Sequence, residues 1–157
     1  MLSSRFLSIS VHWVKGLCSR LHNYHFIDEP KSWSDAGVYC REKFSNLATI
    51  SNTDDMKRLI AAVGSGYEGN VWIGLRDKRW DWKWLLSDKS FYGNESNFKK
   101  WNTSQPDNTQ RYGKLCAAVQ QGTWYDYECE QEFAFVCYDN NMTGNTILST
   151  YKTLLKL

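Results

Sequence analysis

Cysteine is the residue that most constrains how this chain can fold. The sequence contains five, at Cys18, Cys40, Cys116, Cys129 and Cys137. An odd number leaves one thiol without an internal partner, and Cys18 lies apart from the others. Cleavage just after Cys18 would leave four cysteines, which allow three different pairings. The length of 157 residues suits one domain with a real core and not comfortably two.

Three sequons agree with an oxidising compartment. Asn94, Asn102 and Asn141 each begin an Asn-x-Ser/Thr pattern for N-glycosylation. Each pattern is weak alone, but together with an even set of cysteines they favour an exported glycoprotein with disulfide bonds. We therefore expect a secreted protein or an ectodomain fragment.

The N-terminal segment allows two interpretations. Its apolar run, Phe6–Val11, is short and is interrupted by His12 and Lys15, so it is a weak secretory signal. Residues 1–21 are predicted to be either a degenerate signal or an N-terminal extension. No stretch approaches the ~20 apolar residues of a membrane span. The net charge of +2, without a basic stripe, gives nucleic-acid binding no electrostatic support.

Apolar periodicity and turn residues predict a mixture of short helices and strands. Strands are expected over 24–27 (ending at a turn over 28–30), 71–75, 115–119, 123–126 and 133–138, with a brief extended piece at 47–50. Helices are expected from a cap at Ser32 or Ser34 to Phe44, and from Thr53 to Val63 with Met56, Leu59, Ile60 and Val63 on one face. Residues 140–157 are predicted to be a tail or linker.

Residues 76–114 are polar but rich in tryptophan and phenylalanine. Because disordered segments are depleted in aromatic residues, we expect a long ordered loop pinned by its rings. Long ordered loops are uncommon and tend to be functional. This loop contains Gln105-Pro-Asp107, which is a common turn sequence and also places two oxygen-bearing side chains on either side of a proline.

The spaced set of motifs resembles a C-type lectin-like domain. The matching residues, in family order over roughly residues 22–139, are Trp33-Ser-Asp-Ala36 with Cys40, Leu47-Ala-Thr-Ile50, Trp72-Ile-Gly-Leu75, Trp101, Gln105-Pro-Asp107, Cys116, Trp124-Tyr-Asp126, Cys129 and Phe135-Val-Cys137. The resemblance implies an α+β fold with two helices flanking two small antiparallel sheets and a long ordered loop. It also implies the disulfides Cys40–Cys137 and Cys116–Cys129.

The same resemblance implies a calcium site that also touches the sugar. Its ligands would be the residues flanking the loop proline, a carboxylate two residues before the next cysteine, and an Asn-Asp pair after a tryptophan. Gln105, Asp107 and Asp126 supply suitable oxygens, and Gln-Pro-Asp is the galactose-type arrangement in this family. The other two positions hold Lys114 and Tyr125. Calcium needs 6–8 oxygens and carboxylates to balance its charge.

We therefore expect calcium to bind weakly or not at all. Lys114 is predicted to lie between Asp107 and Asp126 as an internal ion pair. Tyr112, Tyr125 and Trp101 are candidate rings for contact with a sugar or a protein. For Trp101 a role as a core anchor is favoured, and for Tyr112 the structural and ligand roles remain equally open.

Three alternatives were weighed against this interpretation. An enzyme has little support, because all three histidines lie near the N-terminus and no nucleophile is paired with a base. A metal cluster of Cys18, His22 and His25 lacks recognised spacing, and nothing points to ice binding. Two binding modules remain: a galactose-type lectin that recognises a glycan or glycoprotein, and a calcium-independent lectin-like module for a protein surface.

Overall fold

The computed structural model describes residues 23–79, 81–85, 98–109 and 115–139, which belong to one compact unit. Several predictions concern residues outside this described part. They are the N-terminal segment 1–21 with Cys18, the sequons at Asn94 and Asn141, the loop residues Tyr112 and Lys114, and the tail 140–157. Among the described residues, no helix is long and apolar enough to cross a membrane.

The two helices begin at capping residues that the sequence supplies. Helix α2 (Trp33–Lys43) is capped by Ser32, whose hydroxyl accepts a hydrogen bond from the backbone N–H of Asp35. Helix α3 (Thr53–Val63) is capped by Asn52, whose side chain accepts from the N–H of Asp55 at 2.8 Å. Both predicted helices are therefore confirmed, and of the two serines proposed for the first cap, Ser32 is the one that caps it.

The apolar face of α3 is narrower than predicted. Met56 and Leu59 are buried, but Ile60 is 45% exposed. Ile60 lies beside the turn at Gly122, where an added Cβ would come within 3.4 Å of its Cδ1 atom. It therefore covers the rim of an apolar groove next to α3 instead of entering the core.

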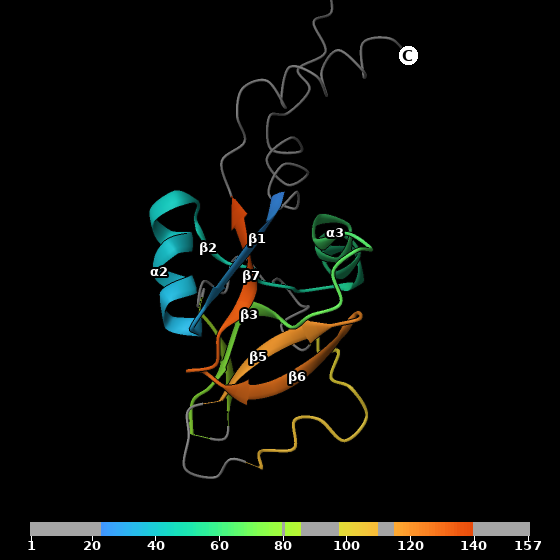
Figure 1. Cartoon of the computed structure of the whole chain (residues 1–157). Coiled ribbons are helices and arrows are strands. Elements are labelled where there is room, and N and C mark those ends of the chain that lie inside the picture. The colour runs from blue at the N-terminus through green and yellow to red at the C-terminus, as the bar shows by residue number, and fades with distance from the viewer. Residues whose placement is uncertain (1–22, 80, 86–97, 110–114, 140–157) are drawn as a thin grey trace, which may run out of the picture. The chain divides into compact units, whose positions relative to one another are not determined.

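Within the described ranges, seven strands form one sheet. They are β1 (Asn23–Lys31), β2 (Asn46–Leu47), β3 (Val71–Asp77), β4 (Trp82–Trp84), β5 (Leu115–Gln120), β6 (Thr123–Glu128) and β7 (Phe133–Asp139). The main order is β1-β7-β3-β5-β6, while β2 also pairs with β7 and β4 with β3. Figure 1 shows α2 and α3 on opposite sides of β1 and β7, with β5 and β6 at the other end of the sheet.

A single parallel contact joins the two antiparallel parts of this sheet. Val71 pairs with Ala134 and Trp72 with Phe135, whereas all the other strand pairs are antiparallel. The predicted fold of two helices with small antiparallel sheets is confirmed, and β3 is the strand that links them. Its residues from Val71 to Leu75 are all buried, which fits a strand covered on both faces.

Apart from shifts of one to three residues at the ends of other strands, two details differ from the strand boundaries predicted from the sequence. Strand β1 does not end at residue 27 but continues through the predicted turn to Lys31, with a shift of register after Ile27. Pro30 is tolerated because β1 is an edge strand, so its missing N–H breaks no ladder bond. Part of the expected loop is also a strand, β4, because Trp82 and Trp84 alternate toward the core around Lys83.

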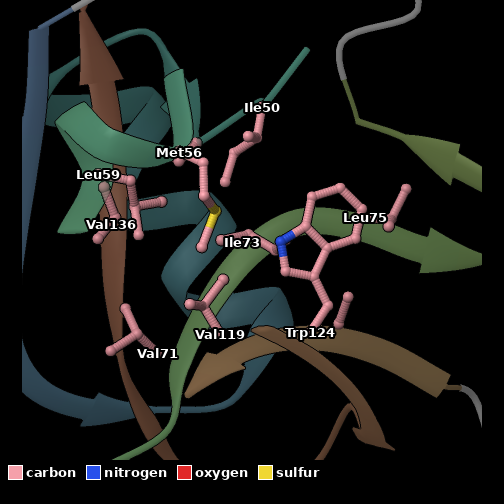
Figure 2. Packing of buried hydrophobic residues seen from close by; sticks show 11 residues of the cluster. Ile50, Met56, Leu59, Val71, Ile73, Leu75, Val119, Trp124 and Val136 are labelled. Atoms are coloured by element: carbon pink, nitrogen blue, oxygen red, sulfur yellow. The ribbon is translucent and has the colours of Figure 1, made fainter. Parts of the chain in front are cut away.

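Trp124 is the centre of one of the two core clusters. Its side chain is fully buried, and Figure 2 shows its indole ring beside Ile73 and Leu75. The rings of Trp84, Phe98 and Trp101 meet it edge to face at 5.7, 5.8 and 5.7 Å between centroids. The prediction that aromatic rings hold the long loop is therefore confirmed for its described part.

Both disulfides pair as the family resemblance implied. Cys40 is bonded to Cys137, which ties α2 to β7, and Cys116 is bonded to Cys129, which ties β5 to the end of β6. Cys40, Cys116 and Cys137 are fully buried. Strand β3 also lies very close to strand β2. A Cβ atom added at Gly74 of β3 would lie 2.9 Å from the carbonyl oxygen of Leu47 in β2.

Candidate functional site

The loop that carries the candidate site lies along the outer edge of β6. Trp124 donates its backbone N–H to the carbonyl of Lys100 at 2.8 Å, and the N–H of Asn102 donates to the carbonyl of Trp124 at 2.9 Å. Trp101 packs against Trp124 and also against Trp82, at 4.7 Å between ring centroids. This edge pairing places residues 105–109 directly beside the end of β6.

The side chain of Gln105 forms a hydrogen bond with the backbone of Asp126. The N–H of Asp126 donates to Oε1 of Gln105 at 3.2 Å, and Nε2 of Gln105 donates to Oδ2 of Asp107 at 3.2 Å. The peptide bond between Gln105 and Pro106 is cis. The three residues predicted as oxygen donors, Gln105, Asp107 and Asp126, are therefore brought together by the fold.

Asp126 accepts two hydrogen bonds from the loop. The N–H of Asp107 donates to its Oδ1 atom at 3.2 Å, and the N–H of Asn108 donates to its Oδ2 atom at 3.0 Å. Asn108 has a φ of 50°, a left-handed conformation that asparagine tolerates better than most residues. The carboxylate of Asp126 thus acts as an anchor for the turn after the proline.

Asp107 is fixed by the next residues of the same loop. The backbone N–H of Thr109 donates to its Oδ1 atom at 3.0 Å. This N–H, together with the Thr109 hydroxyl, lowers the pKa of Asp107 below its ordinary value, because both donors favour the ionised carboxylate. Asp107 remains exposed to solvent, so it is charged at neutral pH and accessible to a ligand.

A polar cavity of about 320 Å³ lies against these residues. Its walls come from the proline loop and from β6 with the turn that follows, and they are formed by Gln105, Asp107, Thr109, Tyr125, Asp126, Tyr127, Glu128 and Gln131. Four of the predicted site residues, Gln105, Asp107, Tyr125 and Asp126, are in this set. Tyr112 and Lys114 lie outside the described residues, so the predicted ion pair of Lys114 stays a prediction.

Two tyrosine rings of β6 belong to the wall and are held differently. Tyr127 donates its hydroxyl to Oδ1 of Asn70 at 3.3 Å and packs edge to face on Phe133 at 5.1 Å. Tyr125 contacts Tyr127, with ring centroids 6.4 Å apart. Tyr127 is therefore fixed in place by its own contacts, and the half-buried Tyr125 beside it is the second ring of the cavity wall.

The sequence interpretation missed four residues of the cavity: Thr109, Tyr127, Glu128 and Gln131. Tyr127 and Glu128 directly follow the Trp124-Tyr-Asp126 motif on the same strand, so the motif itself was a signal. Because β6 is an edge strand, side chains from both of its faces reach a cavity at the edge. A local sequence pattern does not show which strand lies at the edge of the sheet, so it could not predict these four residues.

Asn102, the one sequon asparagine among the described residues, has a structural partner. Its Nδ2 atom donates to Oγ1 of Thr123 at 3.2 Å, and the residue is half-buried. Glycosylation at Asn102 remains a prediction. Among the residues that the structure describes, no group of three or more His, Cys, Asp or Glu side chains could together hold a metal ion.

Comparisons with known proteins agree on one family. Residues 29–139 match the model of the Lectin C-type domain. C-type lectin BfL-2 of Bungarus fasciatus is 35% identical over 156 residues, covering 87% of this chain and 91% of the relative. Asialoglycoprotein receptor 2 of Rattus norvegicus is 32% identical over 134 residues, covering 81% of this chain. The match spans only 40% of that receptor's length.

A solved structure agrees with these sequence matches. The 1.3 Å crystal structure of human lithostathine has a TM-score of 0.64 and 29% identity, covering 78% of this chain and 85% of lithostathine. The shared fold, the two disulfides and the tryptophan and proline motifs all occur within the matched region. The chain therefore belongs to the C-type lectin domain family.

Proposed function

We propose that residues 22–139 form a non-enzymatic, carbohydrate-binding module whose ligand enters the cavity beside the proline loop. The observation that carries the proposal is that two separate segments, the loop with Gln105 and Asp107 and strand β6 with Tyr125 and Asp126, line one polar cavity. Relatives named as lectins and as asialoglycoprotein receptors support a glycan or glycoprotein as the ligand. The Gln105-Pro-Asp107 sequence supports a galactose-type sugar.

The groups in the cavity suit a polyhydroxylated ligand. The carboxylate of Asp107 and the amide of Gln105 offer acceptors and donors for sugar hydroxyls. The ring of Tyr125 offers an apolar surface against which the C–H face of a sugar can pack. Hydroxyl groups bound in this way would replace water on the side chains that the loop already holds in position, which limits the entropy lost on binding.

We further propose that calcium binds this site weakly or not at all. Both carboxylate oxygens of Asp126 already accept backbone N–H groups, and both of Asp107 accept hydrogen bonds from Thr109 and Gln105. Tyr125 stands where the family has an amide ligand, and a phenol is a poor ligand for calcium. The donors that the family resemblance implied, two carboxylates and one amide, fall short of the 6–8 oxygens that calcium requires, so that set does not fit the ion. The third carboxylate of the cavity wall, that of Glu128, is not part of the implied set.

The location of histidine supports a role without catalysis. Among the described residues His25 is the one histidine, and it stacks on Phe44 at 4.4 Å between ring centroids. It lies on β1, at the opposite edge of the sheet order from β6. The site therefore has no imidazole, within the described residues, that could act as a base for a nucleophile.

The two disulfides support an exported protein, secreted or the ectodomain of a longer chain. In this proposal residues 1–21 are a degenerate signal or an extension, and residues 140–157 are a tail or linker. The partner is a glycan or glycoprotein. A protein surface is the remaining kind of ligand, and the following experiment separates the two.

The proposal is tested by retention on a galactose column, with calcium and with a chelator, and with a glucose column as the control. We expect retention on galactose that the chelator does not abolish, and no calcium affinity in the micromolar range by titration calorimetry at neutral pH. Chelator-sensitive retention would overturn the calcium part of the proposal. No retention on any sugar column would instead favour a protein ligand.

A further inference from the structure

One acidic side chain of the cavity wall forms no hydrogen bond or ion pair with the described part of the loop, residues 98–109. Three carboxylates line the cavity, those of Asp107, Asp126 and Glu128. The first two accept hydrogen bonds from residues of the proline loop. The Glu128 carboxylate has no hydrogen bond or ion pair with any of the described residues. It is therefore an acceptor that remains available to a ligand.

The backbone around Glu128 is fixed on both sides. Glu128 is the last residue of β6, where it pairs with Leu115 of β5. The next residue, Cys129, is bonded to Cys116, and the carbonyl of Glu128 accepts the N–H of Gln131 at 3.1 Å. This support holds the half-buried side chain at the cavity wall, so its charge acts on the cavity from a defined position.

The electrostatic character of the wall follows from its composition. The described residues that line the cavity include three carboxylates and no lysine, arginine or histidine. These described residues contribute a negative potential, which favours cationic over anionic groups of a ligand. Because Asp107 and Asp126 already stabilise backbone and side-chain N–H groups, Glu128 is the carboxylate with the most unshared charge toward a ligand.

We propose that Glu128 selects the ligand of this cavity by charge. It favours neutral sugars and sugars that carry a protonated amine over sugars that carry a carboxylate. Glu128 accepts hydrogen bonds from a ligand O–H or N–H group and repels an anionic substituent at the same place. The inference rests on the proposed function, since it concerns which sugars the site accepts once it accepts a sugar.

The test uses three ligands with one sugar frame and different charge. Methyl galactoside is neutral, the methyl glycoside of galactosamine is a cation at pH 7, and the methyl glycoside of galacturonic acid is an anion. Affinities are measured on the full chain with its disulfides intact, by ligand-observed NMR or calorimetry, in chelator at low ionic strength. We expect the amine to bind most tightly and the acid most weakly. The dissociation constant should rise about fivefold from the amine to the neutral sugar and about fivefold again to the acid, because unit charges a few ångströms apart in water interact by about 1 kcal/mol.

The variant Glu128→Gln keeps the size of the side chain and removes its charge. We expect it to reduce the ratio of the affinities for the amine and the acid about fivefold or more, mainly because the acid binds more tightly. Glu130→Gln is the matched control. It makes the same change two residues away, at an exposed position outside the cavity wall, and we expect it to keep the wild-type order.

The outcomes separate the two proposals. If none of the three ligands binds, the proposed function and this inference both fail. If they bind with equal affinity, or the acid binds most tightly, the sugar site stands and the role of Glu128 is wrong. Should Glu128→Gln fail to fold, the wild-type protein is measured at 0.5 M salt instead. Salt screens the charge of the carboxylate, so the affinities for the three ligands must then become more nearly equal. An order unaffected by salt contradicts the inference.

Discussion

The carboxylate of Asp126, on the edge strand β6, accepts the backbone N–H of Asn108 at 3.0 Å, across a sequence separation of 18 residues. A second N–H, that of Asp107, donates to the other carboxylate oxygen. Asp126, which the family resemblance implied as a calcium ligand, therefore anchors the proline loop through both of its carboxylate oxygens.

Substitution of Asp126 by asparagine should loosen the loop without unfolding the domain. One carboxylate oxygen becomes an NH₂ group, which faces a backbone N–H that has lost its acceptor. We expect a loss of about 1–3 kcal/mol in the free energy of unfolding, by chemical denaturation. Faster amide hydrogen exchange at Asp107 and Asn108 should accompany it.

The control for Asp126 is Asp81→Asn, which breaks an exposed ion pair with Lys83. Surface pairs of this kind contribute about 0–1 kcal/mol, so Asp81→Asn should change stability less. Equal effects of the two substitutions, or unchanged exchange at Asp107 and Asn108, would contradict the anchoring role of Asp126.

Acid should release the hydrogen bonds of Asp107 with Thr109. The pKa of Asp107 is lower in the folded state than its ordinary value, so its ionised form contributes stability above that ordinary value, about 4. This contribution is lost as the pH falls through the lowered pKa. An NMR titration of the Asp107 carboxyl carbon should give a midpoint below the ordinary range, accompanied by a shift of the Thr109 amide signal.

Thr109→Val separates the two donors to Asp107. It removes the hydroxyl but keeps the backbone N–H, so the pKa of Asp107 should rise only part of the way to its ordinary value. Thr103→Val, at an exposed position in the same loop, is the control and should leave the midpoint unchanged. An ordinary pKa for Asp107 in the wild-type protein would show that the loop does not hold its carboxylate in this way.

Gly74→Ala should destabilise the domain from within the sheet. Its Cβ would lie 2.9 Å from the carbonyl oxygen of Leu47 and 3.2 Å from that of Ala48, and backbone atoms cannot move aside as a side chain can. We expect a loss of about 1–3 kcal/mol by thermal or chemical denaturation. Gly66→Ala, where no heavy atom lies within 4 Å, should change stability by less than about 0.5 kcal/mol.

The two disulfides should contribute unequally to stability. Cys40 and Cys137 are separated by 97 residues, and Cys116 and Cys129 by 13. On the chain-entropy model, replacing the first pair with alanine costs about 4–5 kcal/mol and replacing the second about 3. Thermal unfolding of the two double variants should therefore give the lower midpoint for Cys40→Ala/Cys137→Ala. The reverse order would mean that loop entropy does not dominate here.

Much of the fold could be predicted from the sequence because local patterns specify it. The cap at Ser32, the helix start at Thr53 and the buried run from Val71 to Leu75 can each be recognised within a short stretch of sequence. The aromatic content of the long loop can be recognised in the same way. The family motifs, spaced along most of the domain, also implied both disulfide pairs. Two predictions were wrong, the end of the first strand at residue 27 and the burial of Ile60. The first depended on which strand forms an edge, and the second on which turn lies opposite the helix.

The side chains available at the site can be read from the chain: Gln105, Asp107 and Asp126 as oxygen donors, and Tyr125 in place of an amide. How those donors are used depends on the folded sheet. The edge of β6 brings residues 18 to 21 positions apart into hydrogen-bond contact. Two N–H groups of the loop therefore donate to the carboxylate of Asp126. The sheet order also placed Tyr127, Glu128 and Gln131 at the same cavity. Hydrogen bonds between distant segments depend on the packing of the whole sheet, and a local pattern contains no information about that packing.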